Sequence, residues 1–396
     1  MRRTLVLFVV LSIFSSGEAL SAKPISDSLS RDRRITPVSR LATTDSCRNV
    51  DATPRNGAAT LGFPHSATVG TLSSLRIAVL PLTFSDLPYQ MSDYSSLQTA
   101  VLEFKKFYET MSYGRAKIEV ELVPYSDAVY MPNIARSYGA FGEYIDIGQV
   151  THDALIRAAP NLNLGSFDMV ALEIARNESV KFWPMANPNP LETSSGRIGG
   201  TVLAGGWQSA NWRAIAHEVG HVWLGLEDLY DMTPLPQYGG TFWEYDLMNS
   251  FRGAAPELIA WHRFMVGWLA DSQIRCIKPS STGKTTHYIS AIADNNFLPK
   301  AIMKPLGVGR TLVIESRRGR GYDKVEDSVL VYVVDSNRSS GDGPIEAKAE
   351  LTLNRSRVPR RDLYVIPVGR SVNVEGTVIR LLASSKWGDL VQISQR

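Results

Sequence analysis

Two histidines with a glutamate beside the first give this chain its clearest chemical signal, in the run His217-Glu218-Val219-Gly220-His221. Residues four apart lie on one face of a helix, so both imidazoles can bind a single ion. This spacing is typical of zinc peptidases, in which the histidines hold the metal and the glutamate is general base for the zinc-bound water. The alternative is two histidines that fall by chance on a core helix, in a chain with only six histidines.

The residues around this motif predict the helix that carries it. The apolar positions are Ile215, Ala216, Val219, Val222 and Trp223. Because apolar residues surround the motif, we expect a helix over 211–224 that is buried beneath a cleft.

A zinc site of this type needs a third protein ligand and leaves its fourth position open. Gly225, just past the expected helix, allows a left-handed turn that returns the chain toward the metal. Asp228 and Glu227 are the nearest carboxylates, and we favour Asp228 with Glu227 as the alternative. Further on, Met248 is placed to form an apolar floor under the site, although a methionine is more often plain core.

Peptide hydrolysis also needs an electrophile beside the metal for the developing oxyanion. The candidates are Tyr230, Tyr245 and His262, each of which could equally be a packed core residue or a partner that orients the ligands. Residues 197–204 are expected to form a short edge strand beside the site, where an extended peptide could add as a further strand. An ordinary sheet edge is the equal alternative.

Length and charge narrow the function classes. The chain has 396 residues, long enough for two domains, with 42 basic against 39 acidic residues. No dense basic run lies away from the ends, which argues against a nucleic acid or a membrane surface as partner. The pairs Arg317-Arg318 and Arg360-Arg361 are expected to be solvated strand ends, and nothing indicates the oligomeric state.

The N-terminus has the features of a secretory signal peptide over residues 1–22. Arg2 and Arg3 precede an apolar core over residues 5–14, which is too short to span a bilayer, and small residues come after it. We therefore expect a secreted, extracellular protein without stable membrane insertion. Residues 23–70 are polar and lack periodicity, as in a linker or propeptide-like segment.

The chain has two cysteines, Cys47 and Cys276. In an exported protein such a pair predicts one disulfide, here tying the N-terminal segment to the region after the catalytic domain. The alternative is that Cys47 caps the zinc in a latent form.

Strands and helices alternate before residue 270. The expected elements are strand 75–84, helix 93–111, strand 116–123, helix 143–159, strand 167–174 and, after the metal helix, helix 255–269. This order predicts an α/β (α+β) catalytic domain over 71–270, with a mixed sheet and an active-site helix.

After residue 270 the pattern changes to short strands between turns. These are expected at 286–292, 311–315, 328–334, 348–353, 363–366, 377–382 and 390–393. They predict a C-terminal all-β, sandwich-like domain over 271–396, whose safer role is to brace the catalytic domain. Asp335, Asp342 and Glu346 lie in a Gly/Ser-rich stretch that could bind calcium, but the spacing fits no EF-hand loop.

Several ordered motifs together resemble the immune inhibitor A family of secreted, metzincin-like zinc metallopeptidases. Residues 217–231 are similar to that family's run H-E-x-x-H-x-L-G-L-P-D-x-Y-D. The further segments of likeness are 112–115, 245–250, 260–263, 267–269, 313–318, 321–323 and 329–335. The resemblance covers about residues 75 to 345, and it implies a zinc endopeptidase that acts on proteins or peptides, with Met248 in a methionine turn.

Two departures from that pattern affect the third ligand. One residue more than in the family separates His221 from Gly225, and Glu227 replaces the proline. An extra helical residue rotates the rest of the segment by about 100°. If the helix absorbs it as a bulge, Asp228 is the ligand; if the distance from His217 governs, the ligand is Glu227.

These observations favour a secreted zinc-dependent endopeptidase with Zn²⁺ as cofactor. The alternative is a non-catalytic secreted or surface binding protein that retains a metallopeptidase fold. Glu218 favours the enzyme, because a site that has lost its catalytic activity has no chemical need for this carboxylate. A metal-dependent hydrolase of other substrates is a third interpretation.

Overall fold

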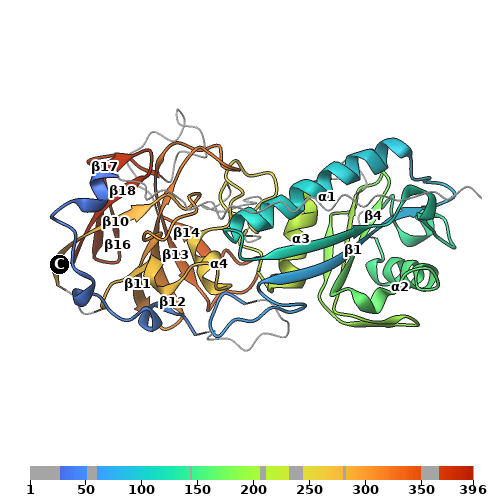
Figure 1. Ribbon diagram of the computed structural model, residues 1–396, viewed down its shortest axis with the longest axis horizontal. Coiled ribbons are helices and arrows are strands. Elements are labelled where there is room, and N and C mark those ends of the chain that lie inside the picture. Colours follow the sequence, from blue (N-terminus) through green and yellow to red (C-terminus); the bar gives the residue numbers. More distant parts are fainter. Residues whose placement is uncertain are drawn as a thin grey trace, which may run out of the picture.

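The computed structural model describes residues 27–50, 60–142, 145–205, 211–231, 244–279, 282–348 and 365–395. The expected signal peptide, the pair Arg360-Arg361 and most of the expected strand 348–353 lie outside these ranges. The described chain is a mixed α/β structure with several sheets and few helices, elongated along one axis (Figure 1). Among the helices of these ranges, none is long and apolar enough to cross a membrane.

The first sheet lies in the N-terminal half and has the strand order β2-β1-β4-β8-β5, with β3 also pairing with β1. Its strands are β1 (Ser74–Thr83), β2 (Lys117–Leu122), β3 (Val129–Tyr130), β4 (Met169–Ile174), β5 (Met185–Asn187) and β8 (Thr201–Gly205). All pairings are parallel except that between β5 and β8. The sheet is therefore mixed, as expected.

The helices of this half are α1 (Met91–Met111), α2 (Ile147–Ala158) and α3 (Trp212–Leu224). Most of the apolar residues of α1 are buried, including Phe104 and Tyr108. Tyr108 packs edge-on against Trp223 of α3, with ring centroids 5.3 Å apart, so α1 and α3 lie side by side (Figure 1). The helix expected over 211–224 is therefore present and buried.

The expected edge strand over 197–204 is wrong. β7 (Gly196–Ile198) pairs with β6 (Leu191–Thr193) in a separate hairpin, and β8 lies inside the first sheet between β4 and β5. Gly199 and Gly200 separate the two strands, and a Cβ on Gly199 would clash with the Val69 side chain. The short strand β5 takes the end of the sheet instead.

The helix expected over 255–269 is much shorter, because only α4 (Ala260–Met265) is helical. Residues 255–259 are held in a non-helical form by tertiary contacts. Ala255 pairs with Tyr245, and the N–H of Glu257 donates to an Asp323 oxygen 3.0 Å away. These long-range bonds replace the local bonds of a helix.

Two further sheets form the C-terminal half. One has the order β14-β13-β12-β11-β9, with β15 also pairing with β13, and the other has the order β10-β18-β17-β16. The first comprises β9 (Ile274–Cys276), β11 (Ala301–Gly307), β12 (Arg310–Arg317), β13 (Ser328–Asp335), β14 (Ile345–Ala347) and β15 (Val365–Ile366). The second comprises β10 (Gly283–Ser290), β16 (Ser371–Val374), β17 (Thr377–Ser385) and β18 (Gly388–Gln395).

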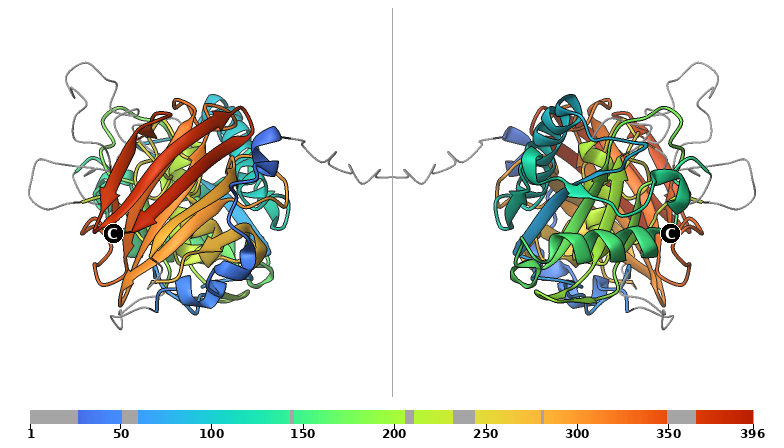
Figure 2. Two further views of the ribbon diagram at one scale, coloured as in Figure 1. Left: turned by 90° about the vertical axis from the view of Figure 1, so that its left-hand side faces the viewer. Right: turned by 90° about the vertical axis from the view of Figure 1, so that its right-hand side faces the viewer.

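The sheet that contains β12 is buried on both faces. Leu312 and Ile314 belong to a core shared with the β10–β18 sheet, which covers it in Figure 2. The alternate residue Val313 belongs to the larger core that continues into the N-terminal half. The β-rich half therefore packs against the α/β half through an apolar face of this sheet.

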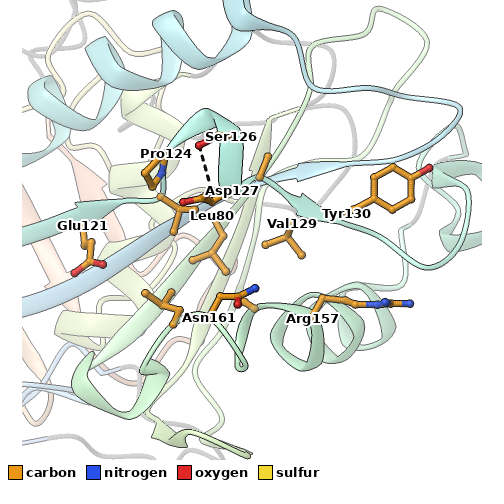
Figure 3. A pocket seen from close by; sticks show the side chains of 13 residues that line it. Leu80, Glu121, Pro124, Ser126, Asp127, Val129, Tyr130, Arg157 and Asn161 are labelled. Atoms are coloured by element: carbon orange, nitrogen blue, oxygen red, sulfur yellow. Dashed lines mark hydrogen bonds between the residues drawn. The ribbon is translucent and has the colours of Figure 1, made fainter.

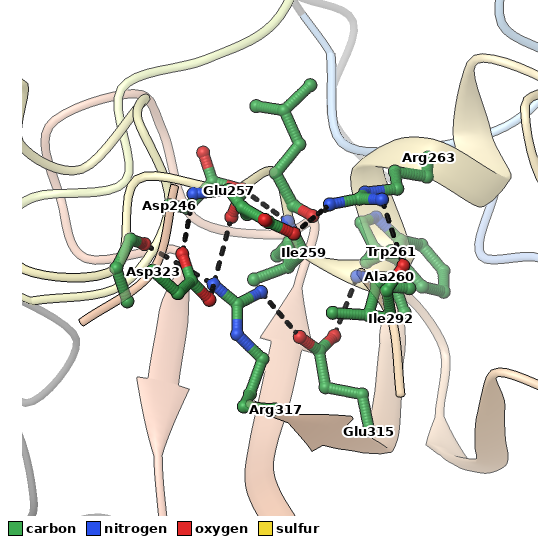
Figure 4. A network of polar contacts seen from close by, with 12 residues as sticks. Asp246, Glu257, Ile259, Ala260, Trp261, Arg263, Ile292, Glu315, Arg317 and Asp323 are labelled. Atoms are coloured by element: carbon green, nitrogen blue, oxygen red, sulfur yellow. Dashed lines mark hydrogen bonds and ion pairs between the residues drawn. The ribbon is translucent and has the colours of Figure 1, made fainter. Parts of the chain in front are cut away.

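Arg317 and Arg318, expected to be solvated, are instead buried at the end of β12. Arg317 contacts Glu315 at 2.9 Å and Asp323 at 2.5 Å, and Arg318 contacts Asp389 at 3.0 Å. We call Arg317, Glu315 and Asp323 the Arg317 group. Figure 4 shows this group beneath the segment that leads to α4.

Residues 27–50 of the expected linker are folded onto the β-rich half. They form the short 3₁₀ turns η1 (Ser28–Arg31), η2 (Val38–Arg40) and η3 (Thr44–Cys47). The expected disulfide joins Cys47 to Cys276, so Cys47 does not reach the metal site. The Asn49 amide donates to the Gly309 carbonyl at 2.9 Å, which fixes the segment further along.

Candidate metal centre

The helix α3 is anchored at its start and in its middle. The Asn211 side chain accepts a hydrogen bond from the N–H of Arg213, which caps the N-terminus. The Tyr108 hydroxyl donates to the Ala216 carbonyl at 2.6 Å. Burial is the main reason that the pKa of Tyr108 is raised well above its ordinary value, so the hydroxyl keeps its proton.

The last turn of α3 is wider than usual. Gly225 is left-handed (φ 61°), and both its N–H and that of Leu226 bond to the Gly220 carbonyl. The bond from Leu226 spans six residues, one more than in the usual glycine-terminated helix. The turn therefore takes up one additional residue before the chain reaches Asp228.

Residues 60–71 cover this end of the helix. The N–H of Thr68 donates to the Trp223 carbonyl, and the His65 imidazole bonds the Leu224 carbonyl at 2.7 Å. The N–H of Thr60 donates to the Gly225 carbonyl. These bonds satisfy carbonyls that a helix end leaves without partners, so this part of the expected linker is a structural element.

Three side chains converge beside α3. Asp228 Oδ1 lies 3.1 Å from His217 Nε2 and 3.2 Å from His221 Nε2, and the two Nε2 atoms are 3.2 Å apart. In a tetrahedral zinc site, with bonds of about 2.0–2.1 Å, two ligand atoms lie about 3.3–3.4 Å apart. The donor set and the spacing therefore fit zinc.

The other ring nitrogens fix the orientation of both imidazoles. His217 Nδ1 lies 2.8 Å from the Leu247 carbonyl, and His221 Nδ1 lies 2.6 Å from the Leu226 carbonyl. Because a carbonyl only accepts, each Nδ1 carries a hydrogen and each Nε2 is left to bind an ion.

The charges around the two histidines and Asp228 favour the binding of a cation. Burial would lower the pKa of His217, but Asp228 and Glu218 outweigh it and raise this pKa to about 9. The pKa of His221 is likewise raised by Asp228 against the effect of burial. Burial would raise the pKa of Asp228, yet the two imidazoles lower it overall, so its carboxylate stays anionic. A metal cation can replace the protons held there.

No protein-family model matches the chain, and no curated protein sequence matches it significantly. The function is therefore inferred from the geometry of the site itself.

Met248 packs directly against α3. A Cβ built on Gly220 would lie 2.7 Å from the Met248 sulfur and 3.0 Å from the Tyr108 hydroxyl. The preceding residue, Leu247, supplies the carbonyl that orients His217. Met248 therefore packs beneath the helix that carries the two histidines, and we call Leu247 and Met248 the floor.

Asp246 holds this floor in place, a role that no sequence pattern indicated. It has a positive φ of 67°, and its carboxylate accepts from the N–H of Met248, the N–H of Ile259 and His262 Nδ1, each at 2.8 Å. Burial would raise the pKa of Asp246, but His262 and the two N–H donors lower it overall. The ionised carboxylate of Asp246 therefore connects the floor to the start of α4.

The other predicted site residues differ in how far they are buried and in whether they contact the two histidines and Asp228. Tyr230 is within hydrogen-bonding range of Asp228; burial, with Asp228, raises its pKa. His262 and Tyr245 are fully buried, which favours the alternative given for both, a packed core residue or a partner that orients other groups. Glu227 is buried but does not join the group formed by the two histidines and Asp228.

An aromatic surface next to the metal group was not predicted. The Phe251 ring lies 6.2 Å from the His217 ring, and Trp183, 56% exposed, lies 6.4 Å from Phe251. The Arg252 guanidinium stacks over both, at 5.4 Å from Trp183 and 5.7 Å from Phe251. The only available signal was that Phe251 and Arg252 lie just after the predicted floor in the sequence.

The carboxylates considered for calcium do not form a site. Asp335 lies 3.6 Å from Arg310, and Glu346 lies 2.5 Å from Lys348. Within the described ranges, the one group of three or more His, Cys, Asp or Glu residues able to hold an ion is that of His217, His221 and Asp228.

A cavity of about 640 Å³ lies elsewhere, between the β2–β3 edge of the first sheet and α2 (Figure 3). Its lining includes Glu121, Asp127, Tyr130, Arg157 and Asn161. None of the described lining residues belongs to the metal group.

Replacing Gly220 by alanine is expected to destabilise the fold by about 1 kcal/mol. Contact with Met248 and Tyr108 would cost about 1–3 kcal/mol, and the higher helix propensity of alanine would return about 1 kcal/mol. Urea denaturation measures the change. The control is Gly148→Ala in α2, where a Cβ meets only an Asp146 oxygen at 3.4 Å. Equal effects of the two variants would contradict close packing at Gly220.

Proposed function

We propose that the chain is a secreted zinc-dependent endopeptidase. The observation that carries this proposal is the convergence of His217 Nε2, His221 Nε2 and Asp228 Oδ1, with Glu218 on the same helix. Two imidazoles and a carboxylate that leave a fourth position open are the usual ligands of catalytic zinc.

The residues divide the work of hydrolysis between them. Zinc bound by the three ligands would activate water and polarise the peptide carbonyl. Glu218 would take a proton from the water while the oxygen of that water attacks the carbonyl carbon. When the C–N bond breaks, Glu218 would give that proton to the leaving amine. Asp228 would keep the ligand set anionic, and Tyr230 is the remaining candidate for contact with the oxyanion.

The third ligand we propose is Asp228. The wide last turn of α3 takes up one residue, which is the difference between this chain and the immune inhibitor A pattern that it resembles. With that residue absorbed, the Gly-to-Asp spacing governs and Asp228 reaches the imidazoles.

The surroundings suit an extended polypeptide substrate. The strand β5 ends the first sheet and packs near α3, so a peptide could add to it as a further strand. The exposed Trp183 and the Phe251 ring beside His217 would then contact substrate side chains.

Zinc content tests the site and its third ligand together. We expect about one zinc per chain in the wild type by elemental analysis, because a site with three protein ligands binds one ion. Asp228→Ala should lose most of it, whereas Glu227→Ala should keep it. Loss in Glu227→Ala alone would reassign the ligand. A wild type without zinc after reconstitution would favour the alternative, a binding protein on a peptidase-like fold.

A further inference from the structure

The connection between β13 and β14 lies directly on the segment that carries Asp228. We call residues 336–344 the β13–β14 loop. The N–H of Asp228 donates to the Ser340 hydroxyl at 2.9 Å, and the N–H of Gly341 donates to the Asp228 carbonyl at 3.2 Å. Both main-chain groups of the proposed metal ligand are thus bound by a loop of the β-rich half.

The contact continues beyond Asp228 as a short antiparallel pairing. The N–H of Gly343 donates to the Tyr230 carbonyl at 3.0 Å, and Asp231 forms a β-bridge with Asp342. Gly343 is left-handed (φ 62°), and a Cβ there would lie 3.2 Å from the Asp231 Cβ. Glycine at this position therefore permits both the turn and the close approach.

The loop has internal bonds that hold its shape. The Asn337 amide donates to Asp335 Oδ1 at 2.8 Å, and the Arg338 guanidinium donates to the Gly343 carbonyl at 3.0 Å. At its base the N–H of Asp335 donates to the Pro344 carbonyl at 2.8 Å. A loop closed in this way can position the residue against which it packs.

The segment that carries Asp228 lacks regular structure of its own. Between the end of α3 and Tyr230 it forms neither helix nor strand. On the side of the floor, the N–H of Leu229 donates to the Met248 carbonyl at 3.1 Å. Asp228 is therefore held between the floor and the β13–β14 loop.

We propose that the β13–β14 loop is a positioning element for the metal ligand Asp228, with the Ser340 hydroxyl as its principal side chain. The inference rests on the metal site of the proposed function. It means that metal affinity depends on the β-rich half, more than one hundred residues away in the sequence. Bonds that orient a metal ligand typically change affinity by about 10–100-fold when they are removed.

The test compares Ser340→Ala with Ser339→Ala in the full chain. Ser339 is the preceding residue of the same loop and is also exposed. We measure zinc dissociation constants by chelator competition and the absorption spectrum of the cobalt-substituted protein. Ser340→Ala should weaken zinc binding about tenfold and change the cobalt spectrum. Ser339→Ala and Ser340→Thr, which keeps a hydroxyl at residue 340, should match the wild type.

The outcomes separate this inference from the proposed function. Zinc bound by the wild type, with equal affinities and spectra for both alanine variants, would overturn the positioning role and leave the metal site standing. A wild type that binds no zinc would overturn the metal site and the positioning role together. Equal melting temperatures of the alanine variants will show that an altered affinity does not come from unfolding.

Discussion

Glu218→Gln is expected to lower kcat/KM for peptide hydrolysis by about 10²–10⁴-fold while zinc stays bound. Glutamine has nearly the same shape as glutamate, but its amide cannot accept the proton of the attacking water. Glu218 belongs to α3 between the two histidines, and His217, His221 and Asp228 act on its charge. Burial raises its pKa, which brings the carboxylate closer to the value that suits a base near neutral pH.

Two measurements on the same preparation separate this role from a structural one. Initial rates on casein or a quenched fluorescent peptide give kcat/KM, and elemental analysis gives the zinc content. The control is Glu192→Gln, a change at an exposed residue of the hairpin strand β6, which should keep both values. A Glu218→Gln enzyme that retained a tenth or more of the wild-type kcat/KM would exclude Glu218 as the base.

Local pattern was enough to predict the part of the site that lies on one helix. The positions of His217, Glu218 and His221 could be predicted from their spacing on α3, and Gly225 was predicted to end it. In the first sheet, the strands expected at 75–84 and 116–123 also lie within a few residues of β1 and β2. In each case neighbouring residues decide the conformation.

The proposed third ligand could not be chosen from local pattern, because distant contacts hold the segment that carries Asp228. Asp228 and Glu227 are adjacent, and the sequence pattern allowed either. The proposed choice of Asp228 rests on the wide turn at Gly220 and on the bond from its N–H to Ser340, which is 112 residues away. The same limit explains the error at 255–259, where bonds to Asp246 and Asp323 override a helical pattern.

Arg317 and its partners show a different failure of pattern. An arginine pair at the end of a strand is usually solvated, since arginine is almost never fully buried unless it is paired. Here the pairing carboxylates, Glu315 and Asp323, come from the same strand and from the loop after it. No pattern in the sequence indicated that Arg317 would pair with these two carboxylates.

Arg317→Met is expected to destabilise the protein by about 3–5 kcal/mol. The substitution keeps much of the side-chain volume, yet it leaves the buried carboxylates of Glu315 and Asp323 without their shared cation. Arg317 Nη2 also lies 3.3 Å from the Ala255 carbonyl and 3.2 Å from the Glu257 carbonyl, so two main-chain acceptors lose a donor (Figure 4). Urea denaturation measures the loss of unfolding free energy.

Two further variants identify the cause of that loss. Arg310→Met, on the same strand, removes a partly exposed arginine paired with Glu375 and should cost no more than about 1 kcal/mol. Adding Asp323→Asn to Arg317→Met should recover part of the stability, because it removes one uncompensated buried charge. A double variant no more stable than the single one would show that lost packing, and not the unpaired carboxylate, dominates.

The same substitution should also affect the candidate metal site. Arg317 binds the carbonyl of Ala255, whose main chain pairs with Asp246, and Asp246 holds Met248 under α3. Loosening this segment removes support from the Leu247 carbonyl that orients His217. At a temperature where Arg317→Met is still folded, we therefore expect weaker zinc binding than in Arg310→Met. Equal zinc affinities of the two folded variants would confine the Arg317 group to stability alone.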